Sequence, residues 1–338
     1  MTTRDWLAEI PSRPLLERGL EARFALPPGD RPLVEPGASL TAGDPLLLHL
    51  RDRRIEEVAP GPGSDDATPR AGARWSPPPG RRHREHEVEG ELLAPLPGKR
   101  DRWRIVTGDH RDQLTAPLGG EVTEVRPGAE IRVRAAGPAL RGAFAAGSAA
   151  RGRLELAADP FGELRPGGID VGRAGSILVV GTRIDAEALT RARAMGVRGI
   201  VVATLPGKEL RDFQASERRQ RAALHPAQPF GVLALDGTVR RPIAGPVAAL
   251  LERMAGTEVA LLVDPPALVF DMEPDELPPL PPDWVRIRSG VNAGLEGRVI
   301  ALLGIRRFAA NVMLDAARVA IEDEPPLDVP IGDLERLV

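Results

Sequence analysis

The sequence predicts a multidomain α+β protein, on three observations. The chain has 338 residues, more than one ordinary hydrophobic core accommodates, so several domains are expected. Apolar and polar residues alternate in the first half, short continuous apolar runs follow from Ser176, and alternation with several glycines returns after Trp284. These patterns predict a β-rich domain over 1–175, a parallel α/β module over 176–270, an acidic Pro-rich linker over 271–283 and a small β domain over 284–338.

Composition and charge exclude several classes of protein. The absence of cysteine excludes disulfides, zinc–thiolate sites, iron–sulfur clusters and cysteine nucleophiles. The net charge of −3 provides no overall positive field, so any contact with nucleic acid requires a local basic patch. Met1 to Arg13 contains no apolar core of a secretion signal, and no apolar run approaches the ~20 residues that cross a bilayer. We therefore expect a cytoplasmic protein with no cofactor and no membrane partner.

A phrase centred on Pro-Gly occurs three times in the β-rich part, at 33–40, 124–131 and 163–170. Proline followed by glycine suits the two central positions of a type II turn, because proline presets φ and glycine accepts a positive φ. Around the second copy, 121–125 and 130–134 alternate apolar and polar residues, as strands with one buried face do. Each copy is predicted to form a hairpin corner.

The segment 116–131, Ala-Pro-Leu-Gly-Gly-Glu-Val-Thr-Glu-Val-Arg-Pro-Gly-Ala-Glu-Ile, resembles a lipoyl- or biotinyl-type barrel-sandwich hybrid. The segment 33–47, with Gly37, Gly43 and Asp44, is similar to the other half of such folds. The modified lysine of that family is missing, since neither copy has a lysine at a hairpin tip. The resemblance implies the scaffold without the swinging-arm chemistry.

The segment 59–89 is rich in Pro, Gly, Asp and Arg and has almost no periodic apolar residues. It predicts a mobile insertion, because it cannot add much to a core. His83, His86 and the nearby glutamates could ligate a metal, but a solvated loop is the favoured interpretation, since the ion would also have to order the segment.

Four apolar runs, at 177–180, 199–202, 231–235 and 259–263, are typical of a parallel sheet whose strands are buried on both faces. Helices are predicted between the runs, at about 185–195, 207–224 and 245–254. Ligands of such sheets bind beyond the carboxyl ends of the strands, here Gly181 to Arg183, Thr204 to Lys208 and Asp236-Gly237. No G-x-G-x-x-G or Walker sequence occurs there, which argues against a dinucleotide or nucleoside triphosphate.

The second predicted helix has a cationic stripe. Its members recur at helical spacing and are Arg211, Gln214, Arg218, Arg221 and His225. The stripe either binds phosphate or an acidic partner, or forms a solvated outer face of little energetic weight.

The segment 285–299, Val-Arg-Ile-Arg-Ser-Gly-Val-Asn-Ala-Gly-Leu-Glu-Gly-Arg-Val, closely resembles the KOW motif of SH3-like barrels in ribosomal proteins and transcription elongation factors. The positions that match its turn glycines are Gly290, Gly294 and Gly297, and those that match its core are Val285, Ile287 and Val299. The resemblance implies a C-terminal SH3-like β-barrel over 284–338 that binds RNA, ribosomes, polymerase or another protein.

Five arginines of this segment favour an anionic partner: Arg286, Arg288, Arg298, Arg306 and Arg307. Acidic residues oppose them at 322–324, Asp328, Asp333 and Glu335, so only one side of the domain is expected to be basic. Trp284 and Phe308 are its only aromatic residues, which leaves little for stacking on bases. Binding to RNA would therefore be weak and salt-sensitive.

The sequence offers no G-x-S-x-G, no H-E-x-x-H and no cysteine nucleophile, and His110 and His225 are interpreted as ordinary surface histidines. We predict a non-enzymatic binding or adaptor protein that associates with a ribonucleoprotein or transcription complex through its KOW-type domain. Two alternatives stay open. One is a protein-only scaffold, and the other is an enzyme or small-ligand sensor with a site at the strand ends of the α/β module.

Overall fold

The computed structural model describes residues 6–58, 72, 74–75, 90–97, 99–221, 228–272, 280–322 and 324–338. Most of the predicted insertion at 59–89, with His83 and His86, lies outside these residues, as does the centre of the predicted linker at 271–283. The chain divides into two compact units. The first comprises Met1–Leu20, Gly137–Gln220 and Gln228–Val338, and the second Glu21–Ala136 and Arg221–Ala227.

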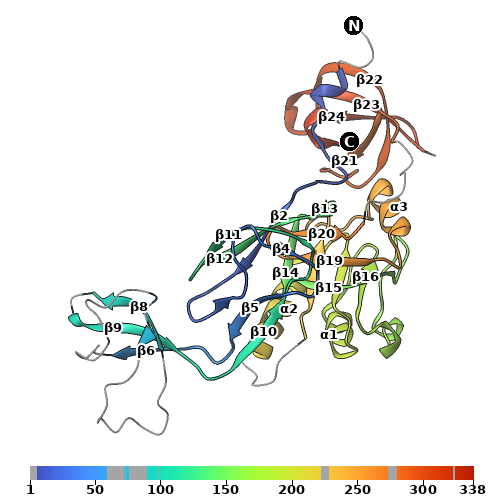
Figure 1. The fold of residues 1–338 in the computed structure, drawn as a ribbon. Coiled ribbons are helices and arrows are strands. Elements are labelled where there is room, and N and C mark those ends of the chain that lie inside the picture. The colour runs from blue at the N-terminus through green and yellow to red at the C-terminus, as the bar shows by residue number, and fades with distance from the viewer. Residues whose placement is uncertain are drawn as a thin grey trace, which may run out of the picture. The chain divides into compact units, whose positions relative to one another are not determined.

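The described residues form strands far more often than helices, so the prediction of a β-rich α+β chain is confirmed at this level (Figure 1). The α-helices among them are α1 (Ala186–Ala194), α2 (Gly207–Arg221) and α3 (Gly245–Arg253). Single 3₁₀ turns occur at Trp6–Glu9, Pro166–Gly168, Val171–Arg173, Ala309–Asn311 and Ile331–Asp333.

The second unit contains three small sheets. One has the order β2 (Glu21–Ala25), β12 (Glu130–Ala135), β11 (Gly120–Arg126) and β4 (Ser39–Leu40). Another has the order β10 (Arg111–Thr115), β5 (Pro45–Leu50) and β3 (Arg31–Pro32). The last has the order β6 (Arg54–Val58), β9 (Lys99–Thr107), β8 (Gly90–Leu96) and β7 (Arg74–Trp75). The pairs in these sheets are antiparallel.

The three Pro-Gly phrases adopt different structures. The second forms the predicted hairpin corner between β11 and β12, with Gly128 at a φ of 80° and the Ala129 N–H donating to the Arg126 carbonyl. The first is a similar turn around Gly37, at a φ of 86°, but the strands on its two sides belong to different sheets. The third is a 3₁₀ turn in the connection between β15 (Ala150–Leu156) and β16 (Ser176–Val180), which pair in parallel, so it forms no hairpin corner. The dipeptide therefore specifies a turn, while the pairing of the flanking strands decides whether a hairpin forms.

Asp52 ties together the two chain segments that lead from β5 to β6 and from β9 to β10. Its carboxylate accepts hydrogen bonds from the backbone N–H groups of Asp109 (3.1 Å) and His110 (2.9 Å) and from the ring of His110 (3.3 Å). Burial alone would raise the pKa of Asp52, but these hydrogen bonds outweigh it and hold the pKa well below its ordinary value.

The first unit contains an eight-stranded sheet. Its order is β13 (Ala139–Arg141), β20 (Ala267–Phe270), β19 (Glu258–Leu262), β15 (Ala150–Leu156), β16 (Ser176–Val180), β17 (Gly199–Val202), β18 (Gly231–Ala234) and β14 (Phe144–Gly147). Four neighbours, β15 to β18, run parallel, and the remaining pairs are antiparallel.

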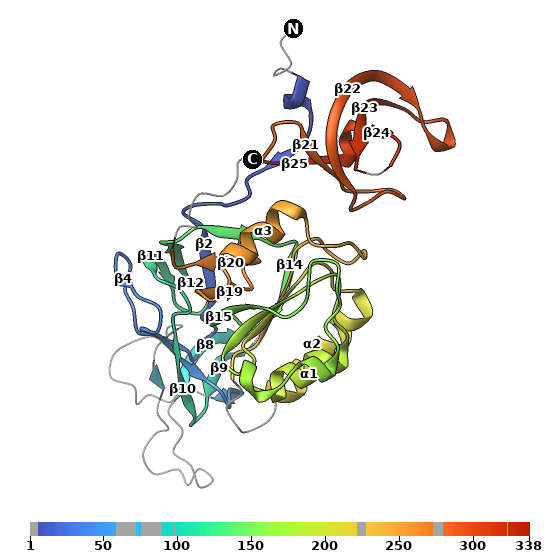
Figure 2. The same ribbon diagram turned by 90° about the vertical axis from the view of Figure 1, so that its right-hand side faces the viewer.

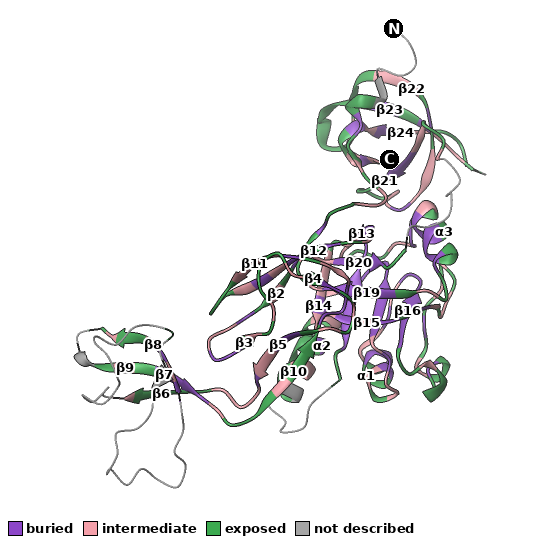
Figure 3. Ribbon diagram, viewed as in Figure 1, coloured by how far each residue is buried: buried purple, intermediate pink, exposed green. Residues whose placement is uncertain are grey.

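Helices cover both faces of this sheet. Alternate residues of β16, β17 and β18 pack on one side against α3 and on the other against α1 and Phe213 of α2. The central strands are consequently buried along their whole length (Figure 3). This double burial explains why the strands appear in the sequence as continuous apolar runs.

Two predictions about this sheet need correction. The run at 259–263 is not a parallel strand, since β19 pairs antiparallel with both β15 and β20. A continuous apolar run reports burial on both faces and carries no information about strand direction. In addition, the strands β13, β14 and β15, at 139–156, fell within the predicted β-rich domain but pair within the sheet of the α/β module.

The first unit also contains a six-stranded sheet with its own apolar core. Its order is β1 (Ser12–Arg13), β25 (Leu334–Leu337), β21 (Trp284–Ile287), β22 (Glu296–Arg307), β23 (Met313–Ile321) and β24 (Leu327–Pro330). The predicted core residues Val285, Ile287 and Val299 are buried in it. The N-terminal strand β1 is an unforeseen member, parallel to β25. Pairing among the described residues leaves β1 and β24 as edges and closes no barrel.

The three predicted turn glycines of this sheet play two roles. Gly290 and Gly294 lie between β21 and β22 with φ of 83° and 99°, the left-handed region that favours glycine. Gly297 instead lies inside β22, opposite Val285 and Ile321. A Cβ atom at Gly297 would lie 2.2 Å from the Ala320 carbonyl oxygen. Gly297 is therefore required by close backbone approach rather than by a turn.

We predict that Gly297→Ala destabilises the protein by about 1 to 3 kcal/mol, because the added methyl group forces two strand backbones apart. The matched control is Gly332→Ala, since a Cβ atom at Gly332 meets no atom within 4 Å. Thermal melting of both variants measures the difference. Equal melting temperatures for the two variants would contradict the close-approach explanation.

We predict that Asp52→Asn lowers thermal stability at neutral pH and that this difference shrinks in acid. Because the folded pKa lies below the ordinary value of 3.8, the stabilisation by the carboxylate is present above that pH and is lost as the pH falls toward the folded pKa. Melting curves from neutral pH to below 3.8 test this, with the exposed Asp109→Asn as control. A difference in melting temperature between Asp52→Asn and wild type that stays constant over this pH range would contradict the lowered pKa of Asp52.

Candidate docking surface on the C-terminal sheet

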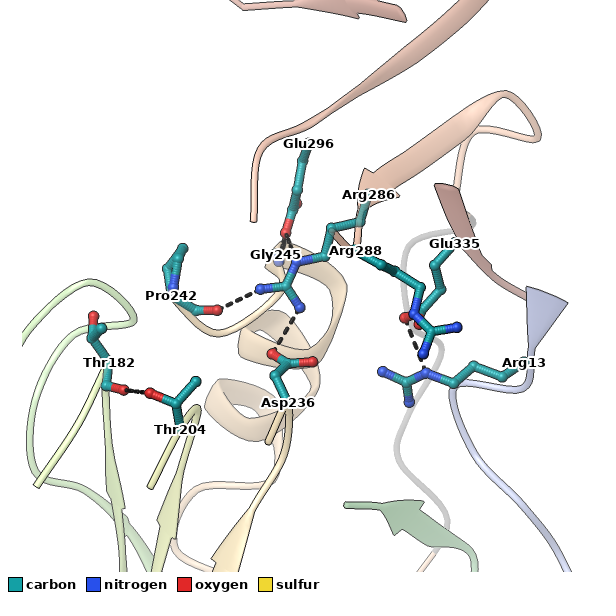
Figure 4. Close-up of polar contacts among 10 residues, drawn as sticks. All are labelled: Arg13, Thr182, Thr204, Asp236, Pro242, Gly245, Arg286, Arg288, Glu296 and Glu335. Atoms are coloured by element: carbon teal, nitrogen blue, oxygen red, sulfur yellow. Dashed lines mark hydrogen bonds and ion pairs between the residues drawn. The ribbon is translucent and has the colours of Figure 1, made fainter. Parts of the chain in front are cut away.

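The carboxyl ends of the parallel strands, where a ligand of this sheet would bind, hold two buried threonines. Thr204 follows β17, and its hydroxyl donates to the Thr182 carbonyl at 2.8 Å. Thr182 follows β16, and its hydroxyl donates to the Phe161 carbonyl at 2.9 Å. Figure 4 shows the link between the two threonines. Both hydroxyls thus hold neighbouring loops together.

Asp236, the strand-end carboxylate after β18, is paired with Arg286 of β21 (Figure 4). The Arg286 side chain is only 2% exposed. Its Nη1 donates to Oδ2 of Asp236 at 2.8 Å, and its Nη2 donates to the carbonyl of Pro242 at 2.6 Å. Arg286 therefore connects the two sheets of the first unit. The prediction that it belongs to a docking surface is wrong, because the loops of the eight-stranded sheet cover it.

Glu296, at the start of β22, completes this buried cluster. Its carboxylate accepts the Gly245 N–H at 2.9 Å and lies 3.8 Å from Nε of Arg286. Gly245 begins α3, whose N-cap residue Ala244 provides no side-chain cap, so Glu296 caps this helix from another sheet. Burial raises the pKa of Glu296 above its ordinary value.

Two other predicted arginines are exposed but paired within the sheet. Nε of Arg288 lies 3.4 Å from Oε2 of Glu335, which also binds Arg13. Nε of Arg298 donates to Oδ2 of Asp283 at 2.7 Å. Exposed pairs of this kind contribute little to stability, and a carboxylate already compensates each charge.

Arg306 and Arg307 differ from the other arginines of the sheet. They are adjacent and exposed at the end of β22, and neither forms an ion pair or side-chain hydrogen bond with another described residue. Neighbouring strand residues point to opposite faces, so Arg306 lies across from Leu314 and Arg307 across from Met313. Arg307 presents uncompensated positive charge on one face of this hairpin. Arg306, on the other face, lies near Asp328, whose pKa is lowered by its hydrogen bond to Arg318 and by the charges of Arg318 and Arg306.

The same hairpin exposes large apolar side chains that the sequence analysis did not single out. The exposed fractions are 62% for Ile305, 47% for Val312, 55% for Met313 and 40% for Leu314. Figures 2 and 3 show the far parts of β22 and β23 as an exposed ribbon. One signal in the sequence could have indicated this exposed surface. After Leu302 the alternation of apolar and polar residues is lost, so the apolar residues there are not confined to one buried face.

The predicted stripe begins on α2, whose residues up to Gln220 belong to the first unit. Arg211 and Arg218 are exposed, whereas the side chains of Arg221 and His225 lie outside the described residues. The helix packs on the eight-stranded sheet through Phe213. The predicted arginines whose side chains the structure describes therefore form two groups on different elements, and Arg306 and Arg307 are accompanied by several exposed apolar residues.

We predict that Arg286→Met destabilises the protein by about 3 to 5 kcal/mol, because Asp236 and Glu296 would lose the buried cation that compensates them. The matched Arg288→Met change, at a side chain 56% exposed, is expected to cost at most about 1 kcal/mol. Urea denaturation of both variants measures the two values. Equal losses would argue that Arg286 is no more important than a surface arginine.

Within the described residues, no three His, Asp or Glu side chains gather as metal ligands do, and no helix is long and apolar enough to span a bilayer. No protein-family model matches the chain, and no curated protein matches it. The resemblances to a KOW-type barrel and to a barrel-sandwich hybrid stay predictions.

Proposed function

We propose that this chain is a non-enzymatic adaptor that docks on a ribonucleoprotein or transcription complex through its six-stranded C-terminal sheet. The observation that carries the proposal is the exposed Arg306–Arg307 pair at the end of β22, which forms no ion pair or side-chain hydrogen bond with another described residue. The KOW-type resemblance of 284–338 supports an RNA-containing partner.

The charge arrangement fits a short electrostatic contact. Guanidinium groups bind phosphate oxygens directly, and each such contact displaces counterions, so affinity falls as salt rises. Because the other arginines of the sheet are paired or buried, few phosphates can be contacted. Binding by this sheet alone would be weak, with Kd on the order of 10⁻⁴ to 10⁻⁶ M.

A small-ligand site at the strand ends has less support. Asp236 is paired with Arg286, and the hydroxyls of Thr182 and Thr204 are bonded to backbone carbonyls. A ligand there would have to break these contacts before binding.

A protein-only scaffold is the second candidate, and the exposed apolar residues of the hairpin favour it. Aliphatic side chains such as Ile305 and Met313 do not improve contact with phosphate, but they bury well against another protein. Arginine and methionine are also enriched at protein interfaces.

We predict that Arg306→Glu reduces recovery of RNA-containing complexes from native lysate by at least about tenfold, because it places like charge against phosphate. The matched control is Arg211→Glu, at an exposed arginine of α2. Recovery is measured with and without nuclease, at low and high salt. If Arg211→Glu reduces the recovery and Arg306→Glu does not, the docking site lies on α2 instead. Nuclease-resistant recovery of a defined protein would favour the scaffold instead.

A further inference from the structure

The far end of the β22–β23 hairpin is a two-stranded ribbon that no other described strand pairs with. β21 pairs with β22 only through Glu296 to Arg298, and β24 pairs with β23 only through Ala316 to Val319. Beyond these residues, 305–307 and 313–315 pair only with each other among the described residues (Figure 2). Irregularities in the register at 299–301 and 302–304 precede this part, and such bulges redirect strands.

The ribbon end exposes apolar surface that a folded protein normally covers. An isolated two-stranded ribbon is marginally stable in water, and contiguous exposed apolar residues mark interaction sites. Ile305 and Met313 are both more than half exposed, so their burial would be favourable.

The register places four side chains on one face of this ribbon. Residues directly opposite each other share a face, as do residues two apart on one strand. Ile305 lies opposite Asp315, and Arg307 lies opposite Met313. The four side chains therefore lie at the corners of a square. Ile305 and Met313 occupy one diagonal, and Arg307 and Asp315 occupy the other. All four are exposed.

The charges of this square are uncompensated. Neither Arg307 nor Asp315 forms an ion pair or side-chain hydrogen bond with another described residue. No described carboxylate forms an ion pair with Arg307, and no described cation forms one with Asp315.

This square is complementary to itself. A second copy can face this one across a two-fold axis that lies between the two faces and runs parallel to the Ile305–Met313 diagonal. This rotation places Ile305 of each copy over Ile305 of the other, and Met313 over Met313. The same rotation sets Arg307 of each copy over Asp315 of the other. One face-to-face contact thereby buries four aliphatic side chains and forms two symmetric ion pairs, the arrangement that an isologous interface requires.

We propose that the chain self-associates as a two-fold dimer through this face of the β22–β23 ribbon. The opposite face, which carries Arg306 and Leu314, stays free for the partner of the proposed function. The self-association does not depend on that function, because its contacts involve this chain alone.

Charge-reversal variants test the dimer. Sedimentation velocity is measured on nuclease-treated protein at concentrations from about 10 µM to about 1 mM, because an interface this small is expected to bind weakly. The wild-type chain is expected to shift from monomer to dimer over this range. Arg307→Asp or Asp315→Arg alone sets like charges against each other and should weaken association at least about tenfold. The matched control is Arg306→Asp, on the opposite face, which should leave association unchanged.

Mixing the two single variants gives the decisive result. In the mixed pair, Asp at 307 of one chain faces Arg at 315 of the other, and Arg307 faces Asp315, so both ion pairs are restored. We expect a heterodimer although each variant alone is monomeric, which also shows that both variants are folded. A wild-type chain that stays monomeric throughout, single variants that dimerise like wild type, or a mixture that stays monomeric would each overturn the proposal.

Discussion

The first unit depends on the buried contact between Arg286 and the loops of the eight-stranded sheet. Burying a guanidinium to 2% exposure is costly unless its charge is paired and hydrogen-bonded. Asp236 pairs the charge and accepts from Nη1, and the Pro242 carbonyl accepts from Nη2, whereas the buried Nε has no hydrogen-bond partner among the described residues. Glu296 from the same β-hairpin caps α3. Because the partners belong to two sheets, these hydrogen bonds fix how the six-stranded sheet meets the strand ends. They also withdraw Asp236, the strand-end carboxylate, from any ligand.

The strand β22 has different roles at its two ends. At its start, Glu296 is half-buried and bonded to the first residue of α3. At its end, Arg306 and Arg307 are exposed and form no ion pair with another described residue. One strand thus holds the sheet in place and carries charged residues beyond it. The bulges between the two ends separate the supported part from the free ribbon.

The two faces of the free ribbon fit the two proposals. Arg307 shares its face with Ile305, Met313 and Asp315, a set that matches a second copy of itself. Arg306 lies on the other face, so a face-to-face dimer would present one Arg306 on each of its two outer sides.

The sequence by itself determined the elements and the buried positions whose signals are local. Continuous apolar runs predicted the parallel neighbours β16, β17 and β18, and the resemblance to a KOW motif implied the buried residues Val285 and Ile287. Only the tertiary structure decided which strands pair, because pairing joins distant segments and leaves no mark in local periodicity. The tertiary structure decided that β19 runs antiparallel to its neighbours and that β13 to β15 join the eight-stranded sheet. It also decided that β1 pairs with β25. Arg286 illustrates the same limit. Arg286 stands between Val285 and Ile287 and so points to the opposite face of β21, but whether that face meets water depended on the loop around Asp236, 50 residues away in the chain.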